Sequence, residues 1–234
     1  MALDSMISYH QTIPEHVFAF EEPVDEKLAA LHSLFDLLQL DDYDDAIDLE
    51  GALTIDMLNM LYGEITMRSL FGILDVARYH LSDREEKVNF LDLGAGLGKV
   101  LVGTKAYGQG WIGDVRGIEL DEERVNVSRR LVEAWLQTEE GKEATEGEGK
   151  GQIIADQGDF SDPAFFPTLA TMDIVFICGT AFGEDLMRTL TSVLSVYCKD
   201  GTILISVSQP ILSCSFLLLQ RLEGVQMSWG LSTM

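Results

Sequence analysis

The residues best suited to chemistry surround a glycine-rich segment, LDLGAGLGKV, at residues 91–100. Glycine lets the backbone turn tightly and approach a ligand closely, and Gly94 and Gly96 directly follow a short apolar run. Loops of this kind, between a strand and a helix, bind either dinucleotides or S-adenosylmethionine. The dinucleotide fingerprint G-x-G-x-x-G would need a glycine at position 99, which is Lys99 here, so the pattern favours S-adenosylmethionine.

Acidic side chains follow the predicted strands around this loop. Asp92, just before the glycines, is a natural partner for the ammonium group at the cofactor's amino-acid end. Glu119 ends the next predicted strand and can accept hydrogen bonds from both ribose hydroxyls. Asp159 and Phe160 follow a third strand, where they offer an acceptor for the adenine amino group and a ring for the adenine face.

Each of these acidic residues also has an ordinary structural explanation. Asp159 could cap a turn, and Glu119 could cap the helix that follows it. Together, however, they stand at successive carboxyl ends of predicted strands, which is where open α/β sheets bind ligands. We therefore expect a cofactor site at that edge of the sheet.

A second unusual stretch lies about one helix ahead of the glycine loop. There Tyr62, Gly63 and Glu64 stand close to Thr66, between two apolar runs. An ordinary helix–helix turn would explain the glycine. It would not explain why an aromatic ring, a carboxylate and a hydroxyl gather around that glycine.

The elements that must position these residues can be read from the hydrophobic pattern. Helical spacing over 24–40, 52–61 and 67–81 predicts three helices. From residue 88 onward, short apolar runs alternate with amphipathic stretches, which predicts an α/β, doubly wound, Rossmann-like sheet after an N-terminal helical extension. The predicted strands are VNFLDL, WIGDVRGIEL, QIIADQGDF, MDIVFICG and GTILISVSQP.

Two later segments have less regular patterns. Residues 138–151, TEEGKEATEGEGKG, are charged and of low complexity, so we expect a flexible surface loop there. Residues 216–230, FLLLQRLEGVQMSWG, predict a further strand or a hairpin.

Composition limits the possible partners and compartments. The 234 residues are 47% hydrophobic with a formal net charge of −23, which predicts a folded core and argues against binding free nucleic acid. We expect the partner to be a basic protein surface, or the protein to bind no macromolecule at all. Cys178, Cys198 and Cys214 form no C-x-x-C pair, so we expect buried, reduced thiols, and the scattered histidines predict no metal site. The chain shows neither a signal peptide nor a membrane-spanning run, which predicts a soluble, intracellular protein.

The motifs YGE, LDLGAGLGK, GIEL, GDF and AFG, in this order, resemble the disruptor-of-telomeric-silencing type of histone-lysine methyltransferase. This non-SET family uses the class I, seven-strand methyltransferase sheet. The similarity runs from about Leu61 to Trp229. The glycine loop marks only the broad superfamily, whereas the upstream YGE and the AFG after the fourth strand are much narrower signals.

The resemblance implies a domain division and a set of cofactor contacts. It makes residues 1–61 an N-terminal helical segment and residues 62–234 an S-adenosylmethionine-binding methyltransferase domain. The YGE segment would form a lid over the methionine end of the cofactor, with Glu64 helping to bind the ammonium group. The cofactor contacts that the resemblance implies are Tyr62, Gly63, Glu64, Thr66, Asp92, Gly94, Gly96, Glu119, Asp159 and Phe160.

The chain departs from the family pattern after the fourth strand, where it reads ICGTAFG. Cys178 and Gly179 stand where the family usually carries an Asn pair, while the following Phe182 is retained. These three residues are expected to face the reacting methyl group, although Phe182 could instead pack in the core. The few residues after Trp229 predict either a fragment or an unusually short last strand.

The favoured function is therefore S-adenosylmethionine-dependent methylation of a protein lysine, with a histone or nucleosome as partner. The alternatives are a methyltransferase for a non-histone or small-molecule acceptor, a catalytically silent cofactor-binding scaffold and, weakly, an NAD-type oxidoreductase. Nuclear localisation follows only from the resemblance, and the cytoplasm stays open. The sequence does not identify the acceptor, the number of methyl groups added or the oligomeric state.

Overall fold

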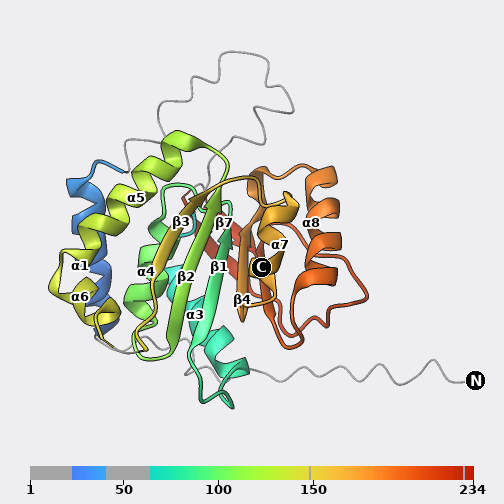
Figure 1. Cartoon of the computed structure of the whole chain (residues 1–234), viewed down its shortest axis with the longest axis horizontal. Helices are drawn as coiled ribbons and strands as arrows, with labels where there is room; N and C mark the ends of the chain where they lie inside the picture. Colours follow the sequence, from blue (N-terminus) through green and yellow to red (C-terminus); the bar gives the residue numbers. More distant parts are fainter. Residues whose placement is uncertain (1–22, 41–63, 148, 229) are drawn as a thin grey trace, which may run out of the picture.

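A five-stranded parallel sheet, in the order β3-β2-β1-β4-β5, lies at the centre of the molecule (Figure 1). The structure is a computed structural model, and it describes residues 23–40, 64–147, 149–228 and 230–234. The strands are β1 (Val88–Leu93), β2 (Ile112–Glu119), β3 (Ile153–Gln157), β4 (Ile174–Cys178), β5 (Ile203–Val207), β6 (Glu223–Met227) and β7 (Gly230–Thr233). The helices are α1 (Pro23–Leu37), α3 (Met67–His80), α4 (Lys99–Tyr107), α5 (Glu122–Leu136), α6 (Glu139–Thr145), η3 (Pro163–Phe165), α7 (Phe166–Leu169), η4 (Gly179–Ala181) and α8 (Glu184–Tyr197).

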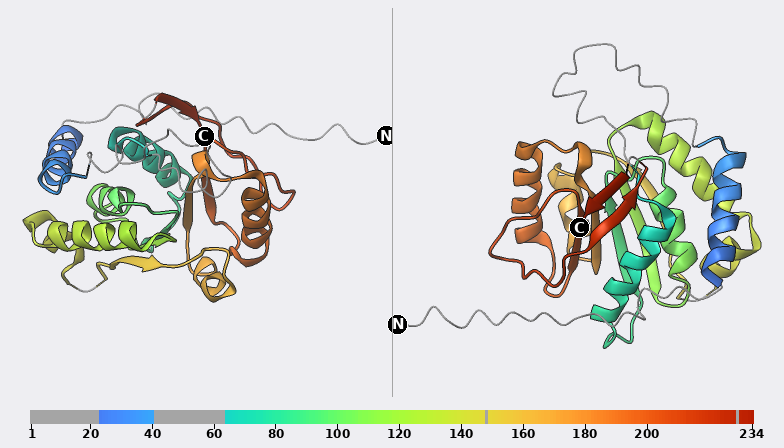
Figure 2. Two further views of the ribbon diagram at one scale, coloured as in Figure 1. Left: turned by 90° about the horizontal axis from the view of Figure 1, so that it is seen from above. Right: turned by 180° about the vertical axis from the view of Figure 1, so that it is seen from behind.

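Helices cover both faces of the sheet, with α1, α3, α4 and α5 on one side and α7 and α8 on the other (Figure 2). Successive residues of a strand point to opposite faces, so Phe90 of β1 packs in the core beneath α3 and α4, while Leu91 packs in the core beneath α8. Burial on both faces explains the nearly continuous apolar run of β1. The predicted doubly wound, Rossmann-like sheet is confirmed.

The predicted N-terminal helices are found where the structure describes them. Helix α1 ends at Leu37, before the predicted residue 40, and Gln39 beyond it takes a left-handed φ of 55°. Helix α3 ends one residue before the predicted end. The predicted helix at 52–61 and the expected domain boundary at residue 61 lie outside the described residues.

The flexible loop predicted at 138–151 is wrong for residues 139–145, which form α6. Thr138 caps this helix by accepting a hydrogen bond from the Gly141 N–H, at 3.0 Å. Gly141 lies so close to α5 that a Cβ there would stand 2.1 Å from the Trp135 carbonyl oxygen. Ala144 is buried against the same core. A cap, one close glycine and one apolar residue therefore order a segment whose composition suggested a loop.

The predicted C-terminal strand or hairpin is an antiparallel hairpin, β6–β7. It is a separate two-stranded sheet, so the seven strands implied by the resemblance are divided into five and two. The hairpin lies beside α3 because Met227 forms a β-bridge with Ile65 and the Gln226 carbonyl accepts from the Thr66 N–H, at 3.0 Å. Its last strand, β7, spans four residues.

Two further expectations concern cysteines and membranes. All three cysteines are free; Cys178 and Cys198 are half-buried and Cys214 is exposed, so the expectation of buried thiols is met only in part by the first two and is wrong for Cys214. The reason is that Cys214 lies on the irregular segment between β5 and β6 rather than on a packed element. Within the described ranges, no helix combines the length and the apolar character that crossing a membrane would require.

Candidate active site

The glycine loop joins the end of β1 to the start of α4 at the carboxyl edge of the sheet. Gly94, Gly96 and Gly98 all have φ between 52° and 88°, a region that residues with side chains rarely adopt. A Cβ on Gly94 would lie 3.0 Å from the ring of Phe182. The glycines therefore allow both the tight turn and the close approach of Phe182, which lies in the segment after β4.

Glu119, at the end of β2, is buried and already bridges two parts of this edge. One carboxylate oxygen accepts from the Gly96 N–H at 2.9 Å, and the other accepts from the Asp121 N–H at 3.0 Å. A carboxylate offers about four lone-pair sites, so these two bonds leave acceptor capacity for ribose hydroxyls. The helix-cap alternative is not what is seen, because Asp121 rather than Glu119 caps α5.

Asp92 is 2% exposed and its Oδ1 has no hydrogen-bond partner among the described residues. Burial, and secondarily the nearby charge of Glu119, raises the pKa of Asp92 to about 8. A cation placed beside this carboxyl would stabilise its ionised form. The ammonium group of S-adenosylmethionine would be such a partner.

Glu64 lies beside Asp92 but has a cationic neighbour in this structure. Its Oε2 is 2.6 Å from Nζ of Lys99, and both side chains are largely buried. The Glu64 backbone is held by Ser228, because the Ser228 N–H donates to the Glu64 carbonyl at 2.8 Å. In the sequence, Lys99 stands out only as a departure from the dinucleotide fingerprint. Its partner Glu64 lies 35 positions away, so no local sequence pattern predicts this ion pair.

The three residues expected near the transferred methyl group follow the end of β4. Burial, the largest cause, raises the pKa of the Cys178 thiol to about 11, so it is protonated at neutral pH. Gly179 is buried, and its carbonyl accepts from the side-chain amide of Gln209 at 2.8 Å. The same amide donates to the Phe182 carbonyl at 2.5 Å. Gln209, from the segment after β5, thus fixes this turn and was not predicted from the sequence.

Phe160 and Phe182, predicted separately for the adenine face and the methyl channel, meet in the structure. Their ring centroids are 5.4 Å apart with a tilt of 40°, and both rings are half-buried. The contact joins the segment after β3 to the segment after β4. A planar base could lie against either ring at this edge.

Two residues predicted to bind the cofactor form local hydrogen bonds that cap a turn or a helix. Asp159 is exposed, and its Oδ1 accepts from the backbone and side chain of Ser161 at 2.8 and 2.6 Å, which is the turn-capping alternative. Thr66 caps α3 by accepting from the Ser69 N–H. Tyr62 and Gly63 lie outside the described residues, so the structure gives no geometry for most of the predicted lid.

Several of the predicted residues line one small cavity. Its walls include Glu64, Asp92, Gly94, Lys99 and Cys178, and its volume is about 20 Å³. That volume holds roughly one water molecule, whereas ligand pockets measure roughly 300 to 1,000 Å³. The residues at the carboxyl edge of the sheet fit a cationic nucleoside, because Asp92 has a buried oxygen without a partner and Glu64 and Glu119 add two further carboxylates. The volume means that such a ligand must part the surrounding side chains as it binds.

The described residues offer no cluster of three or more histidine, cysteine, aspartate or glutamate side chains able to hold a metal ion.

Comparison with known proteins identifies a family whose model matches this chain. The family model described as "Histone methylation protein DOT1" matches residues 56–218, a range that contains every predicted site residue. The rRNA methyltransferase aviRa from Streptomyces viridochromogenes is 13% identical, with a TM-score of 0.55 over 74% of this chain and 85% of that one. At this identity the likeness shows a shared fold.

A weaker structural match is an S-adenosylmethionine-dependent methyltransferase from Thiobacillus denitrificans in complex with S-adenosyl-L-homocysteine. It is 18% identical, with a TM-score of 0.37, and the match covers 59% of this chain and 47% of that one. No curated protein matches the chain.

Proposed function

The chain belongs to the DOT1 histone methylation family, and from this premise we propose that it methylates lysine side chains of a protein, with a histone as the favoured acceptor. As a member of this family it is an S-adenosylmethionine-dependent methyltransferase, and S-adenosylmethionine is its cofactor. The oxidoreductase alternative falls with this membership. The family match over residues 56–218 is the observation that carries the proposal.

The residues of this chain can meet the needs of such a transfer. S-adenosylmethionine, when bound, supplies a methyl group on a sulfonium, which a neutral lysine amine attacks from the opposite side. Asp92 and Glu64 would bind the cofactor's ammonium group, and Glu119 would bind its ribose. Alignment and exclusion of water then contribute most of the rate, because the displacement itself needs little acid–base chemistry.

Cys178 would not interfere with an attacking amine. Its thiol is held protonated by burial, so it would neither carry a charge nor compete as a nucleophile. An apolar channel lowers the pKa of an entering lysine from its usual value near 10.4, which favours the neutral, nucleophilic form. We assign no base here, and the amine proton leaves to solvent.

A radiolabel assay tests the proposal directly. The protein would be incubated with tritiated-methyl S-adenosylmethionine and, separately, with nucleosomes, free histones and total cell extract. We expect label on protein lysine, identified by mass spectrometry, and its loss in Asp92→Asn. Label only on small molecules would refute the protein acceptor.

A catalytically silent cofactor-binding scaffold is the second candidate. One observation favours it: Cys178 and Gly179 stand where the family usually carries an Asn pair that could orient the acceptor. The same experiment separates the two functions. A scaffold would bind S-adenosylmethionine in calorimetry and transfer no label to any fraction.

A further inference from the structure

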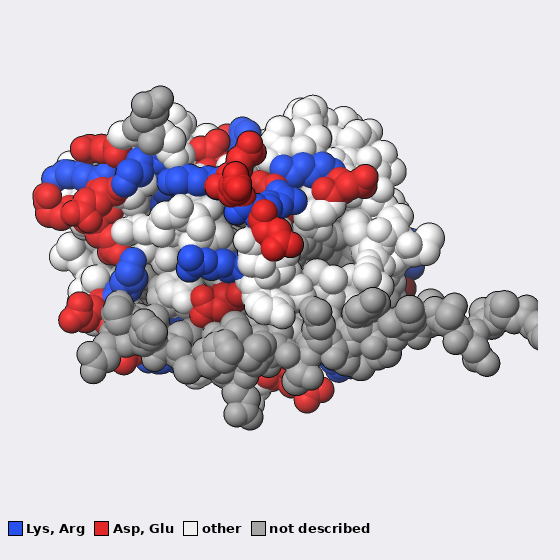
Figure 3. Space-filling model, turned by 90° about the horizontal axis from the view of Figure 1, so that it is seen from below, with Lys and Arg blue, Asp and Glu red and all other residues white. Residues whose placement is uncertain are grey.

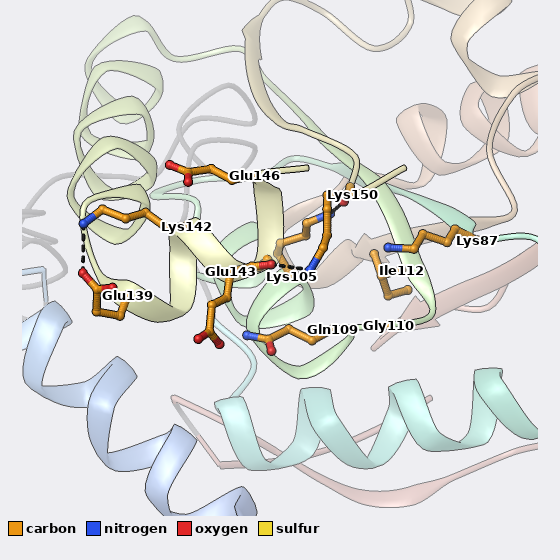
Figure 4. A pocket seen from close by; sticks show the side chains of 11 residues that line it. Lys87, Lys105, Gln109, Gly110, Ile112, Glu139, Lys142, Glu143, Glu146 and Lys150 are labelled. Carbon is orange, nitrogen blue, oxygen red and sulfur yellow. Dashed lines mark hydrogen bonds and ion pairs between the residues drawn. The ribbon is translucent and has the colours of Figure 1, made fainter. Parts of the chain in front are cut away.

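A second and larger cavity lies at the opposite edge of the sheet from the candidate active site. Its volume is about 500 Å³, within the range of small-ligand sites. The parallel strands bring their amino ends together here, so the segments entering β1, β2 and β3 all contribute to the walls. The end of α4 and the helix α6 complete the lining (Figure 4).

Lysine is concentrated in this cavity to a degree that the composition does not suggest. Four of the seven lysines of this acidic chain line it: Lys87, Lys105, Lys142 and Lys150. Seen from below, the molecule carries a band of basic side chains over this edge, interleaved with acidic ones (Figure 3). The charge is therefore distributed unevenly over a protein whose formal net charge is −23.

Three of the four lysines come from elements other than α6, whereas the glutamates and Lys142 belong to α6 or directly follow it (Figure 4). Lys87, Lys105 and Lys150, called here the basic wall, come from the segments before β1 and β3 and from the last turn of α4. Glu139, Glu143 and Glu146, called the acidic wall, belong to α6 or directly follow it. Lys142 pairs with Glu139 at 3.0 Å, so the acidic wall is partly neutralised within its own helix.

The basic wall retains some unused capacity, although Nζ of Lys150 already donates to the Glu143 backbone carbonyl at 2.6 Å. Lys105 is 1% exposed, and its ammonium donates to two backbone carbonyls, those of Gly113 and Lys150, which leaves one of its three N–H donors. Lys87 forms no ion pair within the part of the chain that the structure describes. Burial first, and then repulsion from Lys87 and Lys150, lowers the pKa of Lys105 to about 8, while Asp114 acts in the opposite direction. Positive charge here is thus incompletely balanced.

We propose that this cavity is a binding site for a small phosphate-bearing anion, held by Lys87, Lys105 and Lys150. Lysine ammonium groups form strong charge-assisted hydrogen bonds to phosphate oxygens. The site selects a small ligand over a nucleic-acid strand, because the acidic wall and the large net negative charge repel an extended polyanion. The proposal is independent of the methyl-transfer function, since the two sites lie at opposite edges of the sheet.

The test is calorimetric titration of the full chain with pyrophosphate, and in parallel with AMP and ATP. We expect pyrophosphate to bind with a Kd of about 1 mM or tighter. Stronger binding of the nucleotides would identify a nucleotide as the source of the phosphate, and equal binding would identify an inorganic or simple phosphate. No measurable heat with any of these ligands would overturn the proposal.

Two matched variants distinguish binding of the anion in this cavity from nonspecific attraction to positive charge elsewhere on the protein. Lys87→Gln removes one positive charge from the basic wall, and Arg188→Gln removes one from an exposed position on α8. We expect Lys87→Gln to weaken pyrophosphate binding about tenfold, as for loss of one charged hydrogen bond, and Arg188→Gln to change it less than about twofold. Equal weakening by both variants would contradict the proposal. Unchanged circular dichroism and S-adenosylmethionine affinity in Lys87→Gln would show that the fold is intact.

Discussion

At the scale of single residues, Asp92 illustrates how a binding site can oppose stability. Its carboxyl is buried with a partnerless oxygen, so its ionisation in the free protein is unfavourable. No structural element needs that charge. A cofactor with an ammonium group does, which explains why an acid would occupy this position.

The pKa of Asp92 gives a pH dependence with a definite sign. The folded-state value of about 8 lies above the ordinary 3.8, so the free energy of unfolding falls as pH rises from 4 through 8. Asp92→Asn cannot ionise, and we expect its urea midpoint to fall less than that of the unchanged protein between pH 6 and 9. Parallel pH profiles for the two proteins would contradict this. The same variant should bind S-adenosylmethionine at least about tenfold more weakly.

Glu119 provides a second residue-scale prediction. We expect Glu119→Ala to weaken S-adenosylmethionine binding at least tenfold, about 1.4 kcal/mol, because the ribose loses its acceptor and the Gly96 N–H loses its partner. Calorimetry measures the change, and Glu122→Ala, in the first turn of α5, serves as the control. Unchanged affinity in Glu119→Ala would show that the ribose lies elsewhere.

Asp159 should matter less than Glu119. Its Oδ1 already accepts two hydrogen bonds from Ser161, and a single neutral hydrogen bond contributes only about 0.5–1.5 kcal/mol. We therefore expect Asp159→Ala to reduce S-adenosylmethionine affinity in calorimetry by less than Glu119→Ala does. A larger loss from Asp159→Ala would reverse this ranking of the two contacts.

At the scale of elements, α6 offers a test of why the segment is ordered. In Gly141→Ala, the new methyl group would meet the Trp135 carbonyl, and we expect a loss of about 1–3 kcal/mol of stability from overpacking. Glu143→Ala, an exposed change in the same helix, should stay within about 0.5 kcal/mol. Urea unfolding measures both. Similar values for the two variants would mean that the close approach of α6 to α5 contributes little.

The sequence predicted the sheet well because its strands are short, largely apolar runs, and the central strands β1 and β4 are buried on both faces. The sequence did not predict α6, because one helix cap and one closely packed glycine order a segment whose charged, low-complexity composition is typical of a loop. The ion pair between Glu64 and Lys99 and the bonds of Gln209 to the β4 turn join residues far apart in the chain. Such pairings depend on how elements pack, and no local pattern encodes them.

At the scale of the whole molecule, the charge is organised by the two edges of the sheet. Three largely buried carboxylates, Glu64, Asp92 and Glu119, lie at the carboxyl edge, whereas four lysines, together with three glutamates of α6 and the residue after it, line the cavity at the amino edge. The net charge could be read from the sequence, but this separation could not, because it follows from the order and direction of the strands. The large net negative charge of the whole chain suits a basic acceptor segment.

The net negative charge predicts how the proposed methyl transfer to a histone should respond to salt. Surface attraction between an acidic enzyme and a lysine-rich tail is screened as the Debye length shrinks from about 10 Å at 0.1 M salt to about 3 Å at 1 M. We expect the KM for histone to rise with salt over this range, while the affinity for S-adenosylmethionine, set by buried groups, changes less.

A short acceptor peptide with a single lysine and no other charge is the matched control. It keeps the reacting amine and removes the surrounding positive charge, so its KM should depend only weakly on salt. If histone and control peptide showed the same salt dependence, the acidic surface would contribute nothing to acceptor binding. Docking would then have to rest on shape and apolar contact, or on another subunit.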